Sequence, residues 1–326
     1  MTRPIDIDAL ATGVVAGDRR ALARAITLVE SGRADHRAAA MTLLDQLGTG
    51  QEALRIGLSG TPGVGKSTFI ESFGLMLTGL GKRVAVLAVD PSSARSGGSI
   101  LGDKTRMDHL ARDPNAFIRP SPSQTQLGGV ARRTREAVAL CEAAGFDIVL
   151  IETVGVGQSE TVVAQMSDLF LLLLAPAGGD ELQGVKRGIM EIADMILVNK
   201  ADGDLRAQAT RTCADYAGAL RLLRKRSQDP DGFPKAMTVS ALETVGLTEA
   251  WHEMQTLIAF RRDSNIWQAN RMAQARYWFT EEVRVQMLAR LAADPALHGI
   301  MTTMEAEVTA GRTSPAAAAA AVIKQL

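Results

Sequence analysis

A short glycine-rich segment, followed by a lysine and a serine, is the part of the sequence with the clearest chemistry. Residues 60–68 read Gly-Thr-Pro-Gly-Val-Gly-Lys-Ser-Thr and come directly after an apolar run at 54–59. Glycine has no Cβ, so successive backbone N–H groups of such a loop can surround phosphate oxygens. Lys66 is spaced to reach the β- and γ-phosphates, the Ser67 hydroxyl can bind Mg²⁺, and the N-terminus of the helix that starts here adds positive charge. The segment predicts a nucleoside triphosphate site formed by Gly60, Thr61, Pro62, Gly63, Val64, Gly65, Lys66, Ser67 and Thr68.

A second motif selects the base. Asn199-Lys200-Ala201-Asp202 follows the apolar run at 195–198. The Asp202 carboxylate can accept hydrogen bonds from the N1–H and 2-amino groups of guanine, whereas adenine would leave it unpaired. Lys200 can lay its aliphatic stem along the base, and Asn199 can tie its loop to the base and to the phosphate loop. The motif therefore predicts GTP and GDP, not ATP. A backbone N–H directed at O6 of guanine is expected from the turn after the next strand, at Ser240, Ala241 and Leu242.

Acidic residues at two other predicted strand ends could hold a magnesium ion. Residues 147–155 read Asp-Ile-Val-Leu-Ile-Glu-Thr-Val-Gly, and Glu152 ends the apolar run. A carboxylate here can hold Mg²⁺ through a coordinated water, and the Gly155 N–H can touch the γ-phosphate. Most GTPases have Asp-x-x-Gly at this point, so Glu152 indicates a distinct branch. Asp90, which ends the preceding parallel strand, is a second candidate for positioning the metal or a water.

The sequence contains no strong general base for hydrolysis. Gln158 could orient a water, or it could equally cap the helix that follows. A solvated loop carboxylate explains Asp103 as well as a catalytic role does. Phosphoryl transfer depends on positioning and charge stabilisation, so we expect slow intrinsic hydrolysis that a partner can accelerate. The candidate catalytic residues are Lys66, Asp90, Glu152 and Asp103, and the candidate magnesium ligands are Ser67, Asp90 and Glu152.

The elements that must position these residues alternate along the chain. β-rich runs separated by longer helical stretches are predicted at 55–59, 84–90, 116–119, 147–152, 168–175, 195–199 and 236–240. Near-continuous Val, Ile and Leu in such runs predicts an α/β fold with a parallel sheet covered on both faces. Ligands of these sheets bind at the carboxyl ends of the strands, where the motif residues lie. Helical patterns outside this region predict three parts: an N-terminal helical arm (1–52), a P-loop GTPase domain (53–245) and a C-terminal helical arm (246–326).

Composition limits the kinds of partner. The 326 residues include 36 basic and 36 acidic ones, so the formal net charge of zero favours neither nucleic acid nor an anionic membrane. Cys141 and Cys213 are far apart in the sequence, and we expect free thiols in a reducing compartment. The longest apolar run, 169–177, is too short to span a bilayer, and nothing near Met1 resembles a signal peptide. We expect a cytoplasmic protein.

Several longer motifs resemble one known family, the MeaB/ArgK-type G proteins that serve adenosylcobalamin-dependent methylmalonyl-CoA mutase. The most diagnostic are Glu-Thr-Val-Gly-Val-Gly-Gln-Ser-Glu at 152–160 and Gly-Gly-Ser-Ile-Leu-Gly-Asp-Lys-Thr-Arg-Met at 97–107. Further matches are Val-Asp-Pro-Ser-Ser at 89–93, Arg-Pro-Ser-Pro-Ser at 119–123, Leu-Gly-Gly-Val-Ala at 127–131 and Gly-Asp-Glu-Leu-Gln-Gly at 179–184. The resemblance implies a parallel-sheet P-loop GTPase domain of the SIMIBI-like type, flanked by N-terminal and C-terminal helical extensions.

The same resemblance implies a function. Such proteins are homodimeric GTPase chaperones that bind a cobalamin-dependent acyl-CoA mutase, gate the delivery of its cofactor and protect or reactivate it. The mutase in turn accelerates GTP hydrolysis, and its adenosyltransferase is a further candidate partner. The C-terminal helices match the dimerisation arm of the family, and Asp180, Gln183 and Lys186 match a switch toward the mutase. The chain departs from its relatives at Gln-Thr-Gln, 124–126, so the local switch geometry and the mutase served stay open.

Two other functions are compatible with the motif plan. A nickel-type metallochaperone GTPase would need a metal-loading cluster, but the four histidines and two cysteines are scattered along the sequence. A transport-linked ATPase or kinase is the second alternative. The absence of a membrane-spanning run and the presence of Asp202 both argue against it.

Overall fold

The computed structural model describes residues 5–48, 50–89, 107–119, 127–153, 159–176, 187–223, 226 and 229–325. The chain forms two compact units, Met1–Arg271 and Met272–Leu326. The boundaries expected after residues 52 and 245 divide the chain by sequence pattern, and that three-part division stays a prediction.

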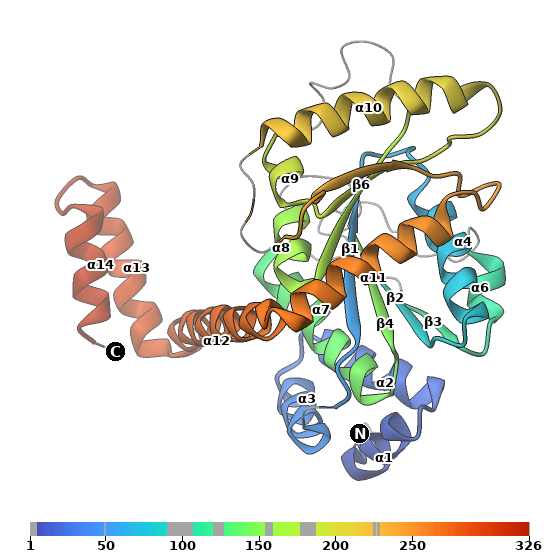
Figure 1. Ribbon diagram of the computed structural model, residues 1–326. Coiled ribbons are helices and arrows are strands. Elements are labelled where there is room, and N and C mark those ends of the chain that lie inside the picture. Colours follow the sequence, from blue (N-terminus) through green and yellow to red (C-terminus); the bar gives the residue numbers. More distant parts are fainter. Residues whose placement is uncertain are drawn as a thin grey trace. The chain divides into compact units, whose positions relative to one another are not determined.

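One parallel sheet organises the first unit (Figure 1). Within the described residues it has seven strands in the order β3-β2-β4-β1-β5-β6-β7, and each neighbouring pair runs parallel. The strands are β1 (Leu54–Ser59), β2 (Val84–Val89), β3 (Ala116–Arg119), β4 (Ile148–Thr153), β5 (Leu169–Leu174), β6 (Met195–Val198) and β7 (Lys235–Thr238). The predicted α/β fold with a parallel sheet is confirmed, and β1 lies at its centre, where the strand order reverses.

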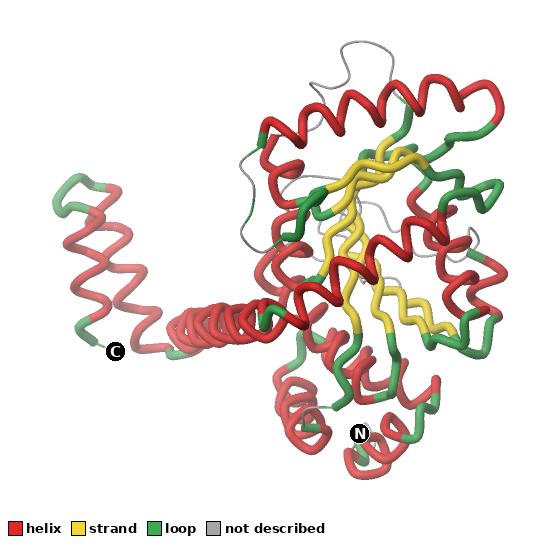
Figure 2. Tube along the Cα trace, in the orientation of Figure 1, coloured by secondary structure: helices red, strands yellow, loops and turns green. Residues whose placement is uncertain are grey.

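Helices cover both faces of this sheet (Figure 2). α4, α6 and α11 lie on one face, α7, α8 and α9 lie on the other, and α10 packs on β6 and β7. These helices are α4 (Lys66–Gly79), α6 (Asp108–Arg112), α7 (Leu127–Ala143), α8 (Ser159–Met166), α9 (Arg187–Ile192), α10 (Arg206–Leu222) and α11 (Leu247–Asp263). A short 3₁₀ turn, η3 (Gly203–Leu205), precedes α10.

The two faces of β1 show why the central strands fold as they do. Ile56 and Leu58 are buried in the core that α4 and α11 share with the sheet. Gly57 faces the other way, toward α8, where a Cβ would come within 2.5 Å of the Ser167 Oγ. The glycine therefore permits close approach of the helix, and burial on both faces favours a continuous apolar strand.

The N-terminal arm consists of α1 (Ile7–Val15), α2 (Arg19–Glu30) and α3 (Ala34–Leu47), and its predicted helical character is confirmed. Asp18 caps α2 by accepting hydrogen bonds from the backbone N–H groups of Arg20 and Ala21 at 2.6 and 2.9 Å. The arm packs on α7, and Arg19 donates to the carbonyl of Asp113 at 3.1 Å. It is thus joined to the side of the sheet that carries β2 and β3.

Buried ion pairs hold the amino ends of the strands. Asp168 and Asp194 stand directly before β5 and β6. Arg261 of α11 donates to Asp194 at 2.6 Å, to Asp229 at 2.8 Å and to the carbonyl of Asp168 at 2.7 Å. Arg271 binds both carboxylate oxygens of Asp168 at 2.6 Å. Because these charges are almost fully buried, each depends on its partners.

The second unit is helical. α12 (Ile266–Ala293) begins in the first unit and ends in the second, followed by α13 (Pro295–Thr309) and α14 (Pro315–Ile323), which pack on each other. Asp294 caps α13 by accepting from the Ala296 N–H at 2.9 Å, and Ser314 caps α14 by accepting from the Ala317 N–H at 3.2 Å. No helix in the described ranges has the length and apolar character needed to cross a bilayer.

Replacing Arg261 by methionine tests the importance of the buried ion pairs. The change leaves Asp194 and Asp229 buried with fewer cationic partners, so we expect the free energy of unfolding to fall by about 3–5 kcal/mol. Urea denaturation followed by circular dichroism measures this loss. The matched control is Arg33→Met, which breaks an exposed pair with Asp35 and should have no measurable effect. Equal stability of the Arg261 variant and the wild type would contradict this interpretation.

Candidate functional site

The glycine-rich loop joins the end of β1 to the start of α4. Gly63 and Gly65 have φ angles of +85° and +90°, which side-chain-bearing residues rarely adopt. A Cβ on Gly65 would also lie 2.7 Å from the amide nitrogen of Asn199. The Lys66 ammonium donates to the carbonyls of Gly60 at 2.8 Å and Thr61 at 3.4 Å, so its charge lies at the loop.

The side chains of the loop fit an anion-binding cradle. Val64 is buried and anchors the loop in the core, whereas Thr61 and Pro62 are exposed. Ser67 is half-buried in the first turn of α4, beside the exposed Thr68. The first backbone N–H groups of this helix are free of intrahelical partners, and its dipole favours negative charge at this end. The geometry is suited to the phosphate chain of a nucleotide.

Asn199 connects the phosphate loop to the predicted base-binding turn. Its Nδ2 donates to the carbonyl of Val64 at 3.0 Å, and its Oδ1 accepts from the backbone N–H of Ala241 at 3.0 Å. The residue is only 2% exposed. A buried amide held from both ends fixes the distance between the two loops.

Asp202 is oriented by a serine. The Ser240 hydroxyl donates a short hydrogen bond to Oδ2 of Asp202 and accepts one from the backbone N–H of Glu243 at 3.0 Å. The carboxylate is half-buried, and it keeps Oδ1 for a ligand. A carboxylate presented in this way can accept from the N1–H and 2-amino groups of guanine.

Lys200 lies against the phosphate loop. Its φ angle of +61° is unusual for a residue with a side chain, and its ammonium donates to the carbonyl of Gly63 at 2.7 Å. The backbone N–H of Ala201 donates to the carbonyl of Val239 at 3.1 Å. The aliphatic stem of Lys200 thus runs from the Asn-Lys-Ala-Asp loop to the phosphate loop, where the face of a bound base would lie.

The base turn offers few free N–H groups. Those of Ser240 and Ala241 are engaged by the Val245 carbonyl and by Asn199, at 2.9 and 3.0 Å. A base that binds here either shares the Ala241 N–H or takes that of Leu242, whose side chain is 78% exposed.

The turn is also held from α4 by a contact that the sequence does not reveal. The Ser72 hydroxyl donates to the Ala241 carbonyl at 2.6 Å. A single serine within a helix carries no motif, so the sequence does not identify Ser72. The sequence also does not reveal the hydroxyl role of Ser240, and its only signal is a position directly after an apolar strand.

Glu152 is the second-last residue of β4 and lies beside the start of the phosphate loop. The register pairs it with Leu58 of β1 and Ala88 of β2, and its exposed fraction is 6%. The next residue, Thr153, donates from its hydroxyl to that of Ser59 at 3.0 Å. A carboxylate between the ends of β1 and β2 fits a magnesium ion shared with the Ser67 hydroxyl, since Mg²⁺ prefers oxygen ligands.

The structure brings together most of the predicted nucleotide site and leaves the rest untested. The phosphate loop, Glu152, the Asn-Lys-Ala-Asp motif and the base turn all lie at the carboxyl ends of β1, β4, β6 and β7. Six candidates lie outside the described residues: Asp90, Asp103, Gly155, Asp180, Gln183 and Lys186.

The cysteines and histidines form no metal site in the described part of the chain. Burial raises the pKa of Cys141 strongly and that of Cys213 more moderately, so both thiols stay protonated at neutral pH. No group of three histidine, cysteine, aspartate or glutamate side chains there could hold a metal ion. The described residues therefore lack the cluster that a nickel-loading protein would need.

Comparison with known proteins identifies relatives over almost the whole chain. A family model described as methylmalonyl Co-A mutase-associated GTPase MeaB matches residues 22–296. A putative GTPase of Caulobacter vibrioides is 54% identical over 322 residues, which are 98% of this chain and 97% of that protein. The mitochondrial methylmalonic aciduria type A homolog of Mus musculus is 50% identical over 329 residues, covering 98% of this chain and 79% of that protein. A crystal structure of a LAO/AO transport system kinase has a TM-score of 0.76 at 36% identity and covers 99% and 98% of the two chains.

Replacing Asp202 by asparagine tests the base site. The amide cannot accept from both guanine donors, so we expect GTP affinity to fall about a hundredfold or more. Xanthosine triphosphate, whose 2-oxo group suits an amide donor, should bind the variant better than it binds the wild type. Fluorescent-nucleotide titration measures both affinities, with Asp204→Asn, an exposed carboxylate two residues away, as the control. Unchanged GTP affinity of the Asp202 variant would show that the base binds elsewhere.

Replacing Gly65 by alanine tests the loop. The new Cβ meets the Asn199 amide and sits at a strained φ, so we expect GTP and GDP affinity to fall about tenfold or more. Gly79→Ala, at the end of α4, is the control because a Cβ there meets nothing within 4 Å. Isothermal titration calorimetry of both variants measures the difference, and equal affinities would refute the close contact with Asn199.

Proposed function

The chain belongs to the family of methylmalonyl Co-A mutase-associated GTPases, MeaB, and from this we propose that it is a chaperone of an adenosylcobalamin-dependent acyl-CoA mutase. It is a P-loop GTPase and binds guanine nucleotides. The proposed role is to gate cofactor loading and to protect or reactivate the mutase. The observation that carries this proposal is the family match across 22–296, a range that includes every described residue of the nucleotide site.

We infer the following roles in GTP hydrolysis. The backbone N–H groups of the phosphate loop and the Lys66 ammonium would hold the phosphates, and charge stabilisation by such groups accounts for most catalysis in this reaction class. Ser67, Glu152 and Asp90 would hold Mg²⁺, which neutralises charge that develops on the phosphate oxygens. Asp103 and Gly155 stay candidates for positioning water and the γ-phosphate. Without a strong general base, the intrinsic rate is expected to be slow.

A homodimer is proposed for the intact protein. Helix α12 exposes Met272, Phe279, Val283 and Met287, with exposed fractions of 69%, 71%, 43% and 50%. The last three recur every four residues and so share one helix face. An apolar row of this kind on a soluble helix is typical of a surface covered by another chain.

Coupling to the mutase is proposed to run through Asp180, Gln183 and Lys186, which the family resemblance assigns to a switch loop. A partner that orders this loop could complete the charge stabilisation that the isolated site lacks. The adenosyltransferase that supplies the cofactor is a further proposed partner, and the cytoplasm is the proposed location.

A second candidate function is phosphoryl transfer to another protein, because one similar crystal structure is described as a transport system kinase. A kinase would leave the γ-phosphoryl group on an acceptor, whereas a GTPase releases it as inorganic phosphate. Phosphate released per GTP consumed distinguishes the two, and a ratio of one supports hydrolysis alone.

The chaperone proposal is tested by hydrolysis with and without a mutase. We expect purified adenosylcobalamin-dependent methylmalonyl-CoA mutase to form a complex with the protein and to raise its GTPase rate about tenfold or more. An acyl-CoA enzyme that does not use cobalamin is the negative control. Absence of both complex formation and stimulation would leave the GTPase activity intact and reject the chaperone role.

A further inference from the structure

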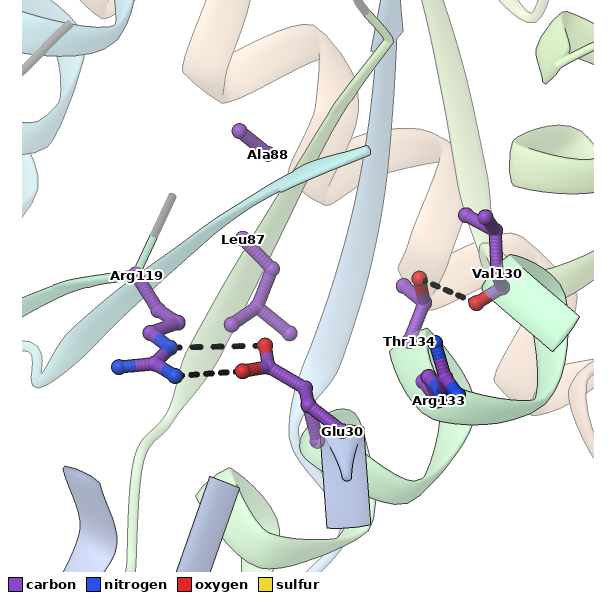
Figure 3. A pocket seen from close by; sticks show the side chains of 8 residues that line it. Glu30, Leu87, Ala88, Arg119, Val130, Arg133 and Thr134 are labelled. Atoms are coloured by element: carbon purple, nitrogen blue, oxygen red, sulfur yellow. Dashed lines mark hydrogen bonds and ion pairs between the residues drawn. The ribbon is translucent and has the colours of Figure 1, made fainter. Parts of the chain in front are cut away.

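A small cavity lies between the N-terminal helices and α7, beside the carboxyl end of β2 (Figure 3). Glu30, at the end of α2, and Arg119, at the end of β3, form one side, and Arg133 of α7 forms the other. Leu87 of β2 lies between them, and Ala88, Val130, Thr134 and Ala137 complete the lining. The cavity has a volume of about 20 Å³, which is room for about one water-sized polar group.

Arg133 has no acceptor at this place. This holds for two of its three nitrogens, because Nε and Nη1 are buried and make no hydrogen bond within the part of the chain that the structure describes, although Glu30 and Glu136 attract its charge. The neighbouring Thr134 hydroxyl donates to the Val130 carbonyl at 2.9 Å. Burial, followed by repulsion from Arg132, lowers the pKa of Arg133. A desolvated guanidinium without an acceptor is costly, so an acceptor from outside the described residues would stabilise it.

The surrounding charges do not supply that acceptor. Arg119 binds Glu30 through Nε and Nη2, and Arg37 binds Glu136 at 2.5 Å. Both nearby carboxylates thus hydrogen-bond to other arginines, and they interact with Arg133 only through their charge. Among the described residues of this cluster, Arg37, Arg119, Arg132 and Arg133 face only Glu30 and Glu136, which leaves two positive charges in excess.

We propose that this cavity binds the carboxylate group of a small molecule. A planar carboxylate matches the donor geometry of a guanidinium, and Arg133 meets it from one side. Arg119 adds positive charge from the opposite side, since its Nη1 is not used in the pair with Glu30. The cavity has room for about one carboxylate oxygen, so the rest of the ligand would lie at its mouth. A phosphate dianion needs more donors than these two arginines offer.

The position of the site suggests what the ligand does. β2 ends at Val89, directly before the metal candidate Asp90, and Ala88 beside the cavity is in register with Glu152. β3 ends at Arg119, five residues before the predicted switch segment at 124–126. Arg119 is a ligand-facing residue and also the last residue of its strand. A bound carboxylate would therefore act as an effector of the nucleotide cycle. The site itself does not depend on the chaperone proposal.

Thermal unfolding of the GDP-saturated protein tests the site, because GDP occupies the phosphate loop and excludes the probe from it. Sodium acetate and sodium propionate are titrated against sodium chloride at constant ionic strength, with sodium phosphate as the comparison. A ligand that binds only the folded state raises Tm in a saturable way. We expect this for the carboxylates, and we expect the apparent Kd to rise about tenfold or more in Arg133→Met.

Arg132→Met is the matched control, since it removes the same charge from the next residue of α7 but does not line the cavity. Its apparent Kd for the carboxylates should stay within about threefold of the wild-type value. Arg133→Met should be about as stable as the wild type in chloride, because the change removes two buried nitrogens that lack hydrogen bonds along with the attraction to Glu30 and Glu136. Three results would overturn the proposal: no shift beyond chloride, a shift that phosphate matches, or an equal loss of the carboxylate effect in both variants. Destabilisation of Arg133→Met in chloride with an unchanged carboxylate effect would assign Arg133 a structural role instead.

Discussion

The nucleotide site depends on one buried amide. Asn199 donates to the Val64 carbonyl and accepts from the Ala241 N–H, and thereby fixes the phosphate loop against the base turn. The three segments it joins lie far apart in the sequence, and only the order β1-β5-β6-β7 brings their strand ends together. Gly65 is required beside it, because a side chain there would collide with the amide. Asn199 thus fixes the distance between the loop that would bind the phosphates and the turn that would bind the base.

The carboxyl ends of the strands bind the ligand, and the amino ends stabilise the sheet. Loops at the carboxyl ends hold exposed and half-buried polar groups for a ligand, as parallel sheets commonly do. The amino ends are fixed by buried arginine–carboxylate pairs, in which Arg261 and Arg271 bind Asp168 and Asp194. Because these ion pairs stabilise the amino ends of the strands, the loops at the carboxyl ends can expose polar groups to a ligand while the sheet stays folded. The N-terminal arm braces the sheet on the side of β2 and β3, through α7 and the Arg119–Glu30 pair.

Sequence patterns predicted the sheet and most of the site for a physical reason. Strands buried on both faces must be apolar throughout, and loops that bind phosphate must contain glycine. Both features can therefore be recognised in a short stretch of sequence. No sequence pattern indicates the hydroxyl role of Ser240, the contact from Ser72 or the Arg133 nitrogens that lack hydrogen bonds. Each depends on which distant backbone or charge the fold places next to it, as when Ser72 meets the Ala241 carbonyl 169 residues away. The candidate catalytic or nucleotide-binding residues Asp90, Asp103 and Gly155 lie outside the described residues, as do the predicted switch residues Asp180, Gln183 and Lys186, and all six stay predictions.

The central claim is that Asn199 and Asp202 together build a site for guanine nucleotides. The most direct measurement is side-by-side titration of the wild-type protein with GTP, GDP and ATP under identical magnesium and salt conditions. We predict that GTP and GDP bind and that ATP binds about a thousandfold more weakly, because adenine leaves the Asp202 carboxylate unpaired. ATP affinity equal to that for GTP would contradict the assignment of the base site.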